Sequence, residues 1–166
     1  STLLNVGSEV RINSDTLQFT IAPDTLVFDS KEWQILDGNR ISYAAEYLRV
    51  ENFELSNGQQ KITLGTSLPN HEGEHVGAIF SNFNLTTITS LLNSEKPLAA
   101  GILNGDVILE NPFGSYGITA DLNIADLATL DVPLGEMNLD ASAAGSDKYE
   151  AKLTIMGENM LLGLVG

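Results

Sequence analysis

The feature that most constrains the fold is an alternation of apolar and polar residues between Leu98 and Ala144. From Tyr116 to Ile124, and again from Glu136 to Ala143, every second residue is apolar, and polar residues or glycine stand between them. Side chains of a β-strand point alternately to its two faces, so this period of two gathers the apolar residues on one face. The stretch therefore predicts amphipathic strands, and the functional question is what their apolar face contacts.

The same alternation predicts further strands before and after that stretch, at residues 17–21, 48–51 and 149–155. At Phe53 the apolar phase shifts by one residue, and we expect a β-bulge at Glu51-Asn52 to cause the shift. Asn57-Gly58 follows soon after and predicts a type I′ hairpin turn, because both central positions of that turn need a positive φ.

Residues Phe83 to Leu92 have apolar side chains at helical spacing and predict the one helix of the fold. Asn84 or Asn82 is expected to cap its start, and Lys96-Pro97 is expected to end it. Before this helix, the residues from 69 to 77 are mostly polar and include two glycines, which predicts a loop.

Many short strands spaced roughly 8 to 12 residues apart predict an all-β fold, in one domain over residues 1–166. Two architectures fit the pattern: a closed β-sandwich, or a curved, repeating amphipathic sheet with an open apolar groove (a β-taco). The open groove is favoured by the small or flexible residues expected on the apolar face: Gly105, Met137, Ala120, Ala141, Ala143 and Ala151. Residues 35–39 echo residues 102–106, which hints at a repeat boundary near 90–97.

Composition excludes several classes of partner and chemistry. The net charge is −14, which disfavours nucleic acid and anionic membrane surfaces. Cysteine is absent, which excludes disulfides and thiolate sites. No run approaches the roughly 20 apolar residues of a membrane span, and no signal peptide is present. Because the last six residues are almost entirely apolar, we expect an excised segment of a longer protein, with its anchor outside this segment.

Residues 71–75 read His-Glu-Gly-Glu-His and match H-E-x-x-H, in which a helix presents two zinc ligands and a glutamate base. Here the central residue is glycine, Pro69 and Gly77 flank the motif, and the sequence has no third histidine. We interpret the motif as a solvated loop that binds no metal. The alternative is a zinc enzyme that uses His71, Glu72 and His75, with Glu95 as a further ligand.

Other catalytic patterns are missing from the sequence. It contains no nucleophile elbow, phosphate-binding loop, dinucleotide fingerprint or calcium loop. We therefore predict a protein that is not an enzyme, with no catalytic residue and no cofactor. The scattered aromatic residues are interpreted as core packing rather than as a sugar-binding platform, and they include Trp33, Phe113, Tyr116 and Tyr149.

The order of the motifs resembles a known family. A short helix, followed by glycine-punctuated strands at 98–109, 116–124 and 133–141, resembles the C-terminal region of the TamB family, within the AsmA-like superfamily. Residues 33–41 and 52–62 look like the versions found in Bacteroidetes-type members. The resemblance spans most of the chain and consists of strand and turn patterns.

This resemblance implies a periplasmic segment of a protein anchored in the bacterial inner membrane. Its apolar groove would carry phospholipid acyl chains between inner and outer membranes and support outer-membrane biogenesis, beside outer-membrane assembly proteins of the barrel-assembly (Omp85) type. The residues that would line the groove are Leu103, Val107, Leu109, Ile118, Leu122, Ile124, Met137, Leu139, Leu153 and Ile155.

Two further functions compete with a lipid groove. A scaffold could bind nascent outer-membrane β-strands at the open sheet edges by β-augmentation. A closed sandwich could instead bind carbohydrate or serve in adhesion.

Overall fold

The computed structural model describes residues 4–23, 26–28, 31–92, 98–144, 148–157 and 160–166. Within these ranges the strands form antiparallel sheets of nine, four and three strands, together with one helix, α1 (Leu85–Leu92). The nine-stranded sheet has the order β16-β15-β14-β13-β12-β11-β10-β9-β6. Its strands are β6 (Gln34–Ile35), β9 (Phe53–Asn57), β10 (Gln60–Gly65), β11 (His75–Asn84), β12 (Ala99–Glu110), β13 (Gly117–Thr129), β14 (Val132–Ala144), β15 (Lys148–Gly157) and β16 (Met160–Val165).

The two smaller sheets come from the N-terminal part of the chain. The four-stranded sheet has the order β2-β3-β7-β8 and the three-stranded sheet the order β1-β4-β5. Their strands are β1 (Leu4–Asn5), β2 (Ser8–Asn13), β3 (Thr16–Ile21), β4 (Val27–Phe28), β5 (Lys31–Glu32), β7 (Arg40–Ala44) and β8 (Tyr47–Glu51).

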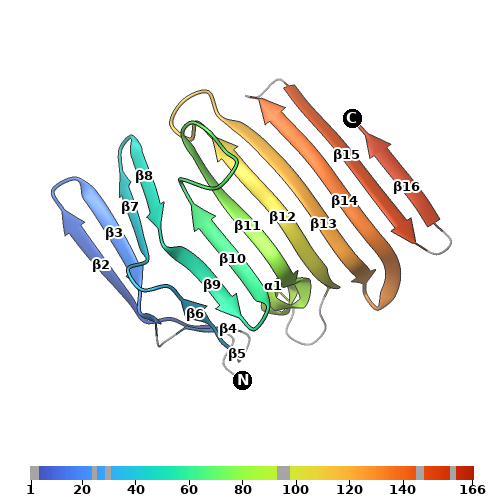
Figure 1. The fold of residues 1–166 in the computed structure, drawn as a ribbon, viewed down its shortest axis with the longest axis horizontal. Coiled ribbons are helices and arrows are strands. Elements are labelled where there is room, and N and C mark those ends of the chain that lie inside the picture. Colours follow the sequence, from blue (N-terminus) through green and yellow to red (C-terminus); the bar gives the residue numbers. More distant parts are fainter. Residues whose placement is uncertain (1–3, 24–25, 29–30, 93–97, 145–147, 158–159) are drawn as a thin grey trace.

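The strands of the two larger sheets lie side by side in one open array, from β2 at one end to β16 at the other (Figure 1). The prediction of an all-β open sheet with one short helix is confirmed. The closed sandwich is wrong for the described residues, because the two large sheets lie beside each other and neither closes into a barrel. The strands β12 to β14 have 12 or 13 residues each, so they are longer than the short strands predicted.

The β-bulge expected at Glu51-Asn52 is wrong. At this point the chain passes from one sheet to another. β8 pairs with β7 in the four-stranded sheet, whereas β9 pairs with β10 and β6 in the nine-stranded sheet. Asn52 stands between β8 and β9 with a φ of 50°. The apolar phase shifts at Phe53 because the chain leaves one sheet and enters the other at this residue.

The hairpin after β9 is confirmed, but its turn lies one residue further along than predicted. Asn57 pairs with Gln60, so the two-residue loop is Gly58-Gln59. Only Gly58 has a positive φ there, at 61°, so the predicted type I′ turn is wrong. Type I′ requires a positive φ at both central residues.

The helix begins later than its apolar spacing predicted. Phe83 pairs with Leu103 and is a buried residue of β11, because the strand continues to Asn84. Asn84 caps α1, since its Oδ1 accepts a hydrogen bond from the Thr86 backbone N–H at 2.9 Å. Asn82, the other predicted cap, has a φ of 48° within a register shift between β11 and β12. The predicted helix stop at Lys96-Pro97 lies outside the described residues.

The expected repeat boundary near 90–97 stays a prediction. The helix ends at Leu92, and residues 93–97 lie outside the described ranges. On either side of this segment, β11 and β12 pair directly, from His75↔Glu110 to Asn84↔Ile102. One sheet therefore includes the strands before and after the boundary.

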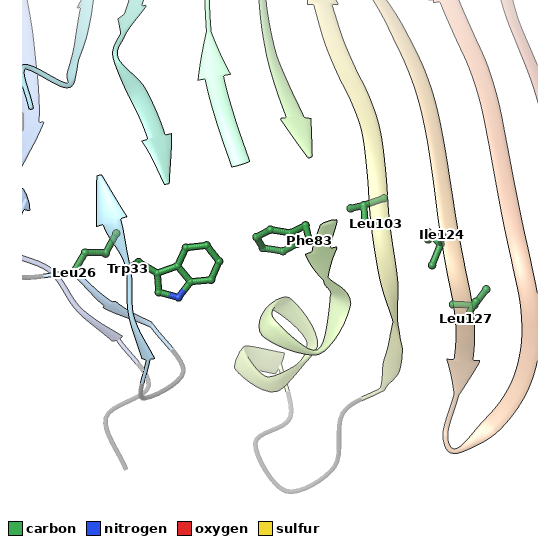
Figure 2. Close-up of a cluster of buried hydrophobic side chains, with 6 residues drawn as sticks. All are labelled: Leu26, Trp33, Phe83, Leu103, Ile124 and Leu127. Carbon is green, nitrogen blue, oxygen red and sulfur yellow. The ribbon is translucent and has the colours of Figure 1, made fainter. Parts of the chain in front are cut away.

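Two clusters of buried apolar side chains hold the sheets together. One joins the four-stranded and nine-stranded sheets through Ile21, Ile35, Val50 and Phe53. Nearby, the side chain of Asn39 is 1% exposed and bonds both the N–H and the C=O of Ile21. The second cluster lies at the α1 end of the nine-stranded sheet (Figure 2), and consists of Leu26, Trp33, Phe83, Leu103, Ile124 and Leu127.

Candidate functional site

The candidate site is one face of the nine-stranded sheet, which we call the apolar face. Residues paired in register across antiparallel strands project to the same side. One row of register partners crosses all nine strands: Ile35, Leu55, Ile62, Phe80, Gly105, Leu122, Leu139, Leu153 and Leu164. At a strand spacing of about 4.8 Å, this row is roughly 38 Å long.

A parallel row runs on each side of this one. Nearer α1 lie Phe83, Leu103, Ile124, Met137, Ile155 and Leu162. Toward the opposite ends of the strands lie Leu64, Ala78, Val107, Ala120, Ala141 and Ala151, and beyond them Val76, Leu109, Ile118, Ala143 and Tyr149. Every one of these side chains is apolar except the hydroxyl of Tyr149.

The apolar face is covered at the α1 end. Trp33 packs against Phe83 there, with ring centroids 5.9 Å apart, and both side chains are 4% exposed (Figure 2). Leu85 of α1 packs against the same cluster. Trp33 thus covers the apolar face at Phe83.

Away from α1 and toward β16, the apolar face is uncovered. Along β13 the exposed fraction falls from 41% at Ile118 to 7% at Ile124. On β16, Leu162 and Leu164 are 42% and 56% exposed. The face is therefore a closed core at one end of its strands and an exposed apolar surface at the other.

All ten predicted groove residues lie on the apolar face. Leu103 and Ile124 are buried members of the core cluster. Ile118 is exposed, and the other seven are half-buried: Val107, Leu109, Leu122, Met137, Leu139, Leu153 and Ile155. Sequence reasoning missed the N-terminal half of the same face, at Ile35, Leu55, Ile62 and Phe80, although the first three belong to alternating runs.

The opposite face of the same strands is polar and acidic. Asp106, Asp121 and Asp140 are register partners on three adjacent strands, and Lys152 is the next residue in their row. Like charges directly opposite each other reduce the stability of a sheet, so these three neighbouring aspartates do not stabilise the pairing of β12, β13 and β14. Beside them the Asn123 amide donates to the Asn138 side chain at 2.9 Å. Asp121, Asp140 and Lys152 are exposed, so this part of the face contacts water.

The His-Glu-Gly-Glu-His motif is less solvated than predicted. His75 is the first residue of β11 and is 4% exposed. Its Nε2 accepts a hydrogen bond from the Leu68 N–H at 2.9 Å, and its Nδ1 lies 2.9 Å from the Gly73 carbonyl oxygen. Both ring nitrogens therefore hold the loop before β11 in place.

The two histidines of this motif have different partners. His71 lies 3.9 Å from an Asp106 oxygen, and its ring centroid is 5.7 Å from that of His75. Among the described residues, no three histidine, aspartate or glutamate side chains gather as a metal site. Glu95, the suggested further ligand, lies outside the described residues.

The interpretation of the aromatic residues as core packing is correct only for Trp33. The other three are exposed, at 41% for Phe113, 46% for Tyr116 and 75% for Tyr149. Phe113 and Tyr116 lie in the connection between β12 and β13, and Tyr149 lies near the start of β15. These positions are at the strand ends opposite α1, where the apolar face is exposed.

Comparisons with known proteins give no relative: no family model, curated protein or solved structure matches this chain. Among the described residues, no helix is both long and apolar enough to cross a bilayer.

Proposed function

We propose that the chain is a non-enzymatic β-groove segment of a TamB-like envelope protein, whose apolar face holds phospholipid acyl chains. In this proposal it acts in the periplasm, as part of a protein anchored in the inner membrane, and passes lipid toward the outer membrane. The observation that supports acyl binding is the apolar row from Leu122 to Leu164, which is interrupted by no polar side chain.

The dimensions of the uncovered surface suit an acyl chain. Three strand spacings separate β13 from β16, which is roughly 14 Å. The hydrocarbon core of a bilayer is about 30 Å thick, so the chains of one leaflet extend over about 15 Å. Each buried methylene contributes about 0.8 kcal/mol, so a few methylenes per position give modest binding that allows a chain to move on.

A charge placed within the row is expected to abolish acyl binding. Leu139→Glu puts a carboxylate at the centre of the uncovered row, where an apolar chain would desolvate it. Binding of a fluorescent long-chain fatty acid should weaken about tenfold or more, measured by titration of the folded protein. Leu161→Glu is the matched control, because Leu161 pairs with Met156 on the opposite face and is 77% exposed.

Two results would contradict the proposal. One is unchanged binding by a Leu139→Glu variant that keeps the circular dichroism spectrum of the parent. The other is an equal loss of binding in Leu161→Glu, which would show a charge effect that does not depend on the face.

A scaffold for nascent outer-membrane β-strands is the second candidate. Among the described strands β16 pairs with β15 alone, and its sequence from Met160 to Val165 contains no charge. Charged side chains are a common protection of sheet edges, and β16 has none, so an added strand could pair there. Protein crosslinks at β16 without lipid crosslinks on the apolar face would favour this function.

A further inference from the structure

A second candidate site is a cleft of about 350 Å³ at the strand ends opposite α1. Three segments far apart in the sequence form it. The turn and start of β8 supply Glu46, Tyr47 and Arg49, the loop before β11 supplies Glu74, and the segment after β12 supplies Phe113. The proposed acyl surface does not include these residues.

Two aromatic rings in the cleft lining are held partly in solvent. Tyr47 is 44% exposed and Phe113 is 41% exposed, and they come from different connections of the sheet. An exposed aromatic face attracts organic cations through its quadrupole, and quaternary ammonium groups are the ligands that aromatic clusters recognise best. The rings therefore favour a ligand with an ammonium group.

The charges in the cleft are mixed. Glu46 and Glu74 form no ion pair in the part of the chain that the structure describes. Arg49 contacts a Glu51 carboxylate oxygen at 2.9 Å. A hydrogen bond with Tyr47, and then the charge of Glu51, raise the pKa of Arg49 above its ordinary value, so Arg49 is a cation at every accessible pH. The lining thus offers two carboxylates and one guanidinium.

Two other polar side chains of the lining, His75 and Thr66, have structural partners. His75 uses both ring nitrogens within its own loop, as described above. The Thr66 hydroxyl oxygen accepts a hydrogen bond from the Val50 N–H at 3.1 Å. The charged side chains, the two rings and the exposed Ser67 hydroxyl are therefore the groups best placed to recognise a ligand.

From this lining we infer that the cleft binds a zwitterionic phospho-ammonium group, of the kind found in phosphocholine and phosphoethanolamine. The ammonium group lies against Tyr47 and Phe113 beside Glu46 and Glu74, and the phosphate lies at Arg49. Each charge of the ligand then meets the opposite charge of the protein, whereas a purely anionic ligand would lie beside two carboxylates that form no ion pair among the described residues. This site is separate from the apolar face and would stand even if that face held no acyl chain.

Calorimetric titration of the 166-residue protein with soluble phosphocholine tests the site. Saturable binding is expected for phosphocholine, with much weaker binding of inorganic phosphate alone and of choline alone. Phe113→Leu should weaken phosphocholine binding about fivefold, from loss of one cation–π contact. Tyr116→Leu is the matched control, because Tyr116 is an exposed aromatic residue of the same connection that does not line the cleft.

A second arm identifies the source of the group. If vesicles of phosphatidylcholine bind through the same cleft, Arg49→Gln and Glu74→Gln should each reduce vesicle binding, and a lipid headgroup is the ligand. Binding of soluble phosphocholine without vesicle binding assigns the site to a free small molecule. The inference is overturned if phosphocholine shows no saturable binding, if phosphate alone binds equally well, or if Phe113→Leu and Tyr116→Leu have equal effects.

Discussion

Gly105→Ala is expected to destabilise the fold by about 4 kcal/mol, the sum of backbone strain and a steric clash. Gly105 has a φ of 120°, a conformation that residues with a side chain rarely adopt. A Cβ at this position would meet the carbonyl oxygen of Asp121 in the neighbouring strand β13. That oxygen belongs to the backbone of a central strand and cannot move aside without breaking the β12–β13 pairing.

Urea denaturation of Gly105→Ala and of Gly163→Ala measures this effect. Gly163 lies in β16, and a Cβ there would meet no atom within 4 Å. Its replacement should change the free energy of unfolding by no more than about 0.5 kcal/mol. If Gly105→Ala unfolds at the same urea concentration as Gly163→Ala, the close approach of β12 and β13 at Gly105 is wrong.

The second large effect is expected along one strand, where the apolar face changes from core to surface. Ile124 and Ile118 lie on the same face of β13, at 7% and 41% exposure. Ile124→Ala should cost about 3.5 kcal/mol, because it leaves a cavity beside Leu103 in the closed end. Ile118→Ala should cost about 1 kcal/mol, since water already reaches much of that side chain.

Both variants replace isoleucine by alanine on the same face of the same strand. The change in strand propensity and the side-chain atoms removed are therefore the same in both variants. The difference between the two unfolding free energies reports the covering layer alone. Equal costs at the two positions would mean that the apolar face is covered along its whole length, which would leave no surface for a ligand.

The strands of the apolar face could be predicted from the sequence, because period two is a local property of the chain. All ten predicted groove residues lie on one face for this reason. Local patterns could not show which of them are covered. Leu103 and Ile124 are buried in a cluster that also contains Leu26 and Trp33, which come from a segment about 70 residues or more away in sequence.

The errors in the prediction have similar causes. Phe83 has helical spacing with the residues after it, yet pairing with Leu103 keeps it in β11. His75 looked solvated because its neighbours are polar, but a single hydrogen bond from Leu68 helps hold it inside. Ile108 lies on the generally polar face and is fully buried, and both Ile108 and Leu68 lie close to Gly77, an arrangement that alternation does not anticipate.

The two proposed sites lie at the same ends of the strands. The apolar face is exposed at the strand ends opposite α1, and the cleft of Tyr47 and Phe113 is at the same strand ends. A phospholipid has an apolar and a zwitterionic part, so one molecule could engage both. Loss of acyl binding in Leu139→Glu and loss of phosphocholine binding in Phe113→Leu separate the two contributions.

Photo-crosslinking from two adjacent positions of β14 tests acyl binding most directly. A photoreactive phenylalanine analogue replaces either Leu139, on the apolar face, or Asn138, on the polar face. After exposure to vesicles that contain phosphatidylethanolamine, we predict a phospholipid adduct from position 139 and none from position 138, read by mass spectrometry. Equal adducts from both positions, or no lipid adduct from position 139, would contradict the proposal that the apolar face holds acyl chains.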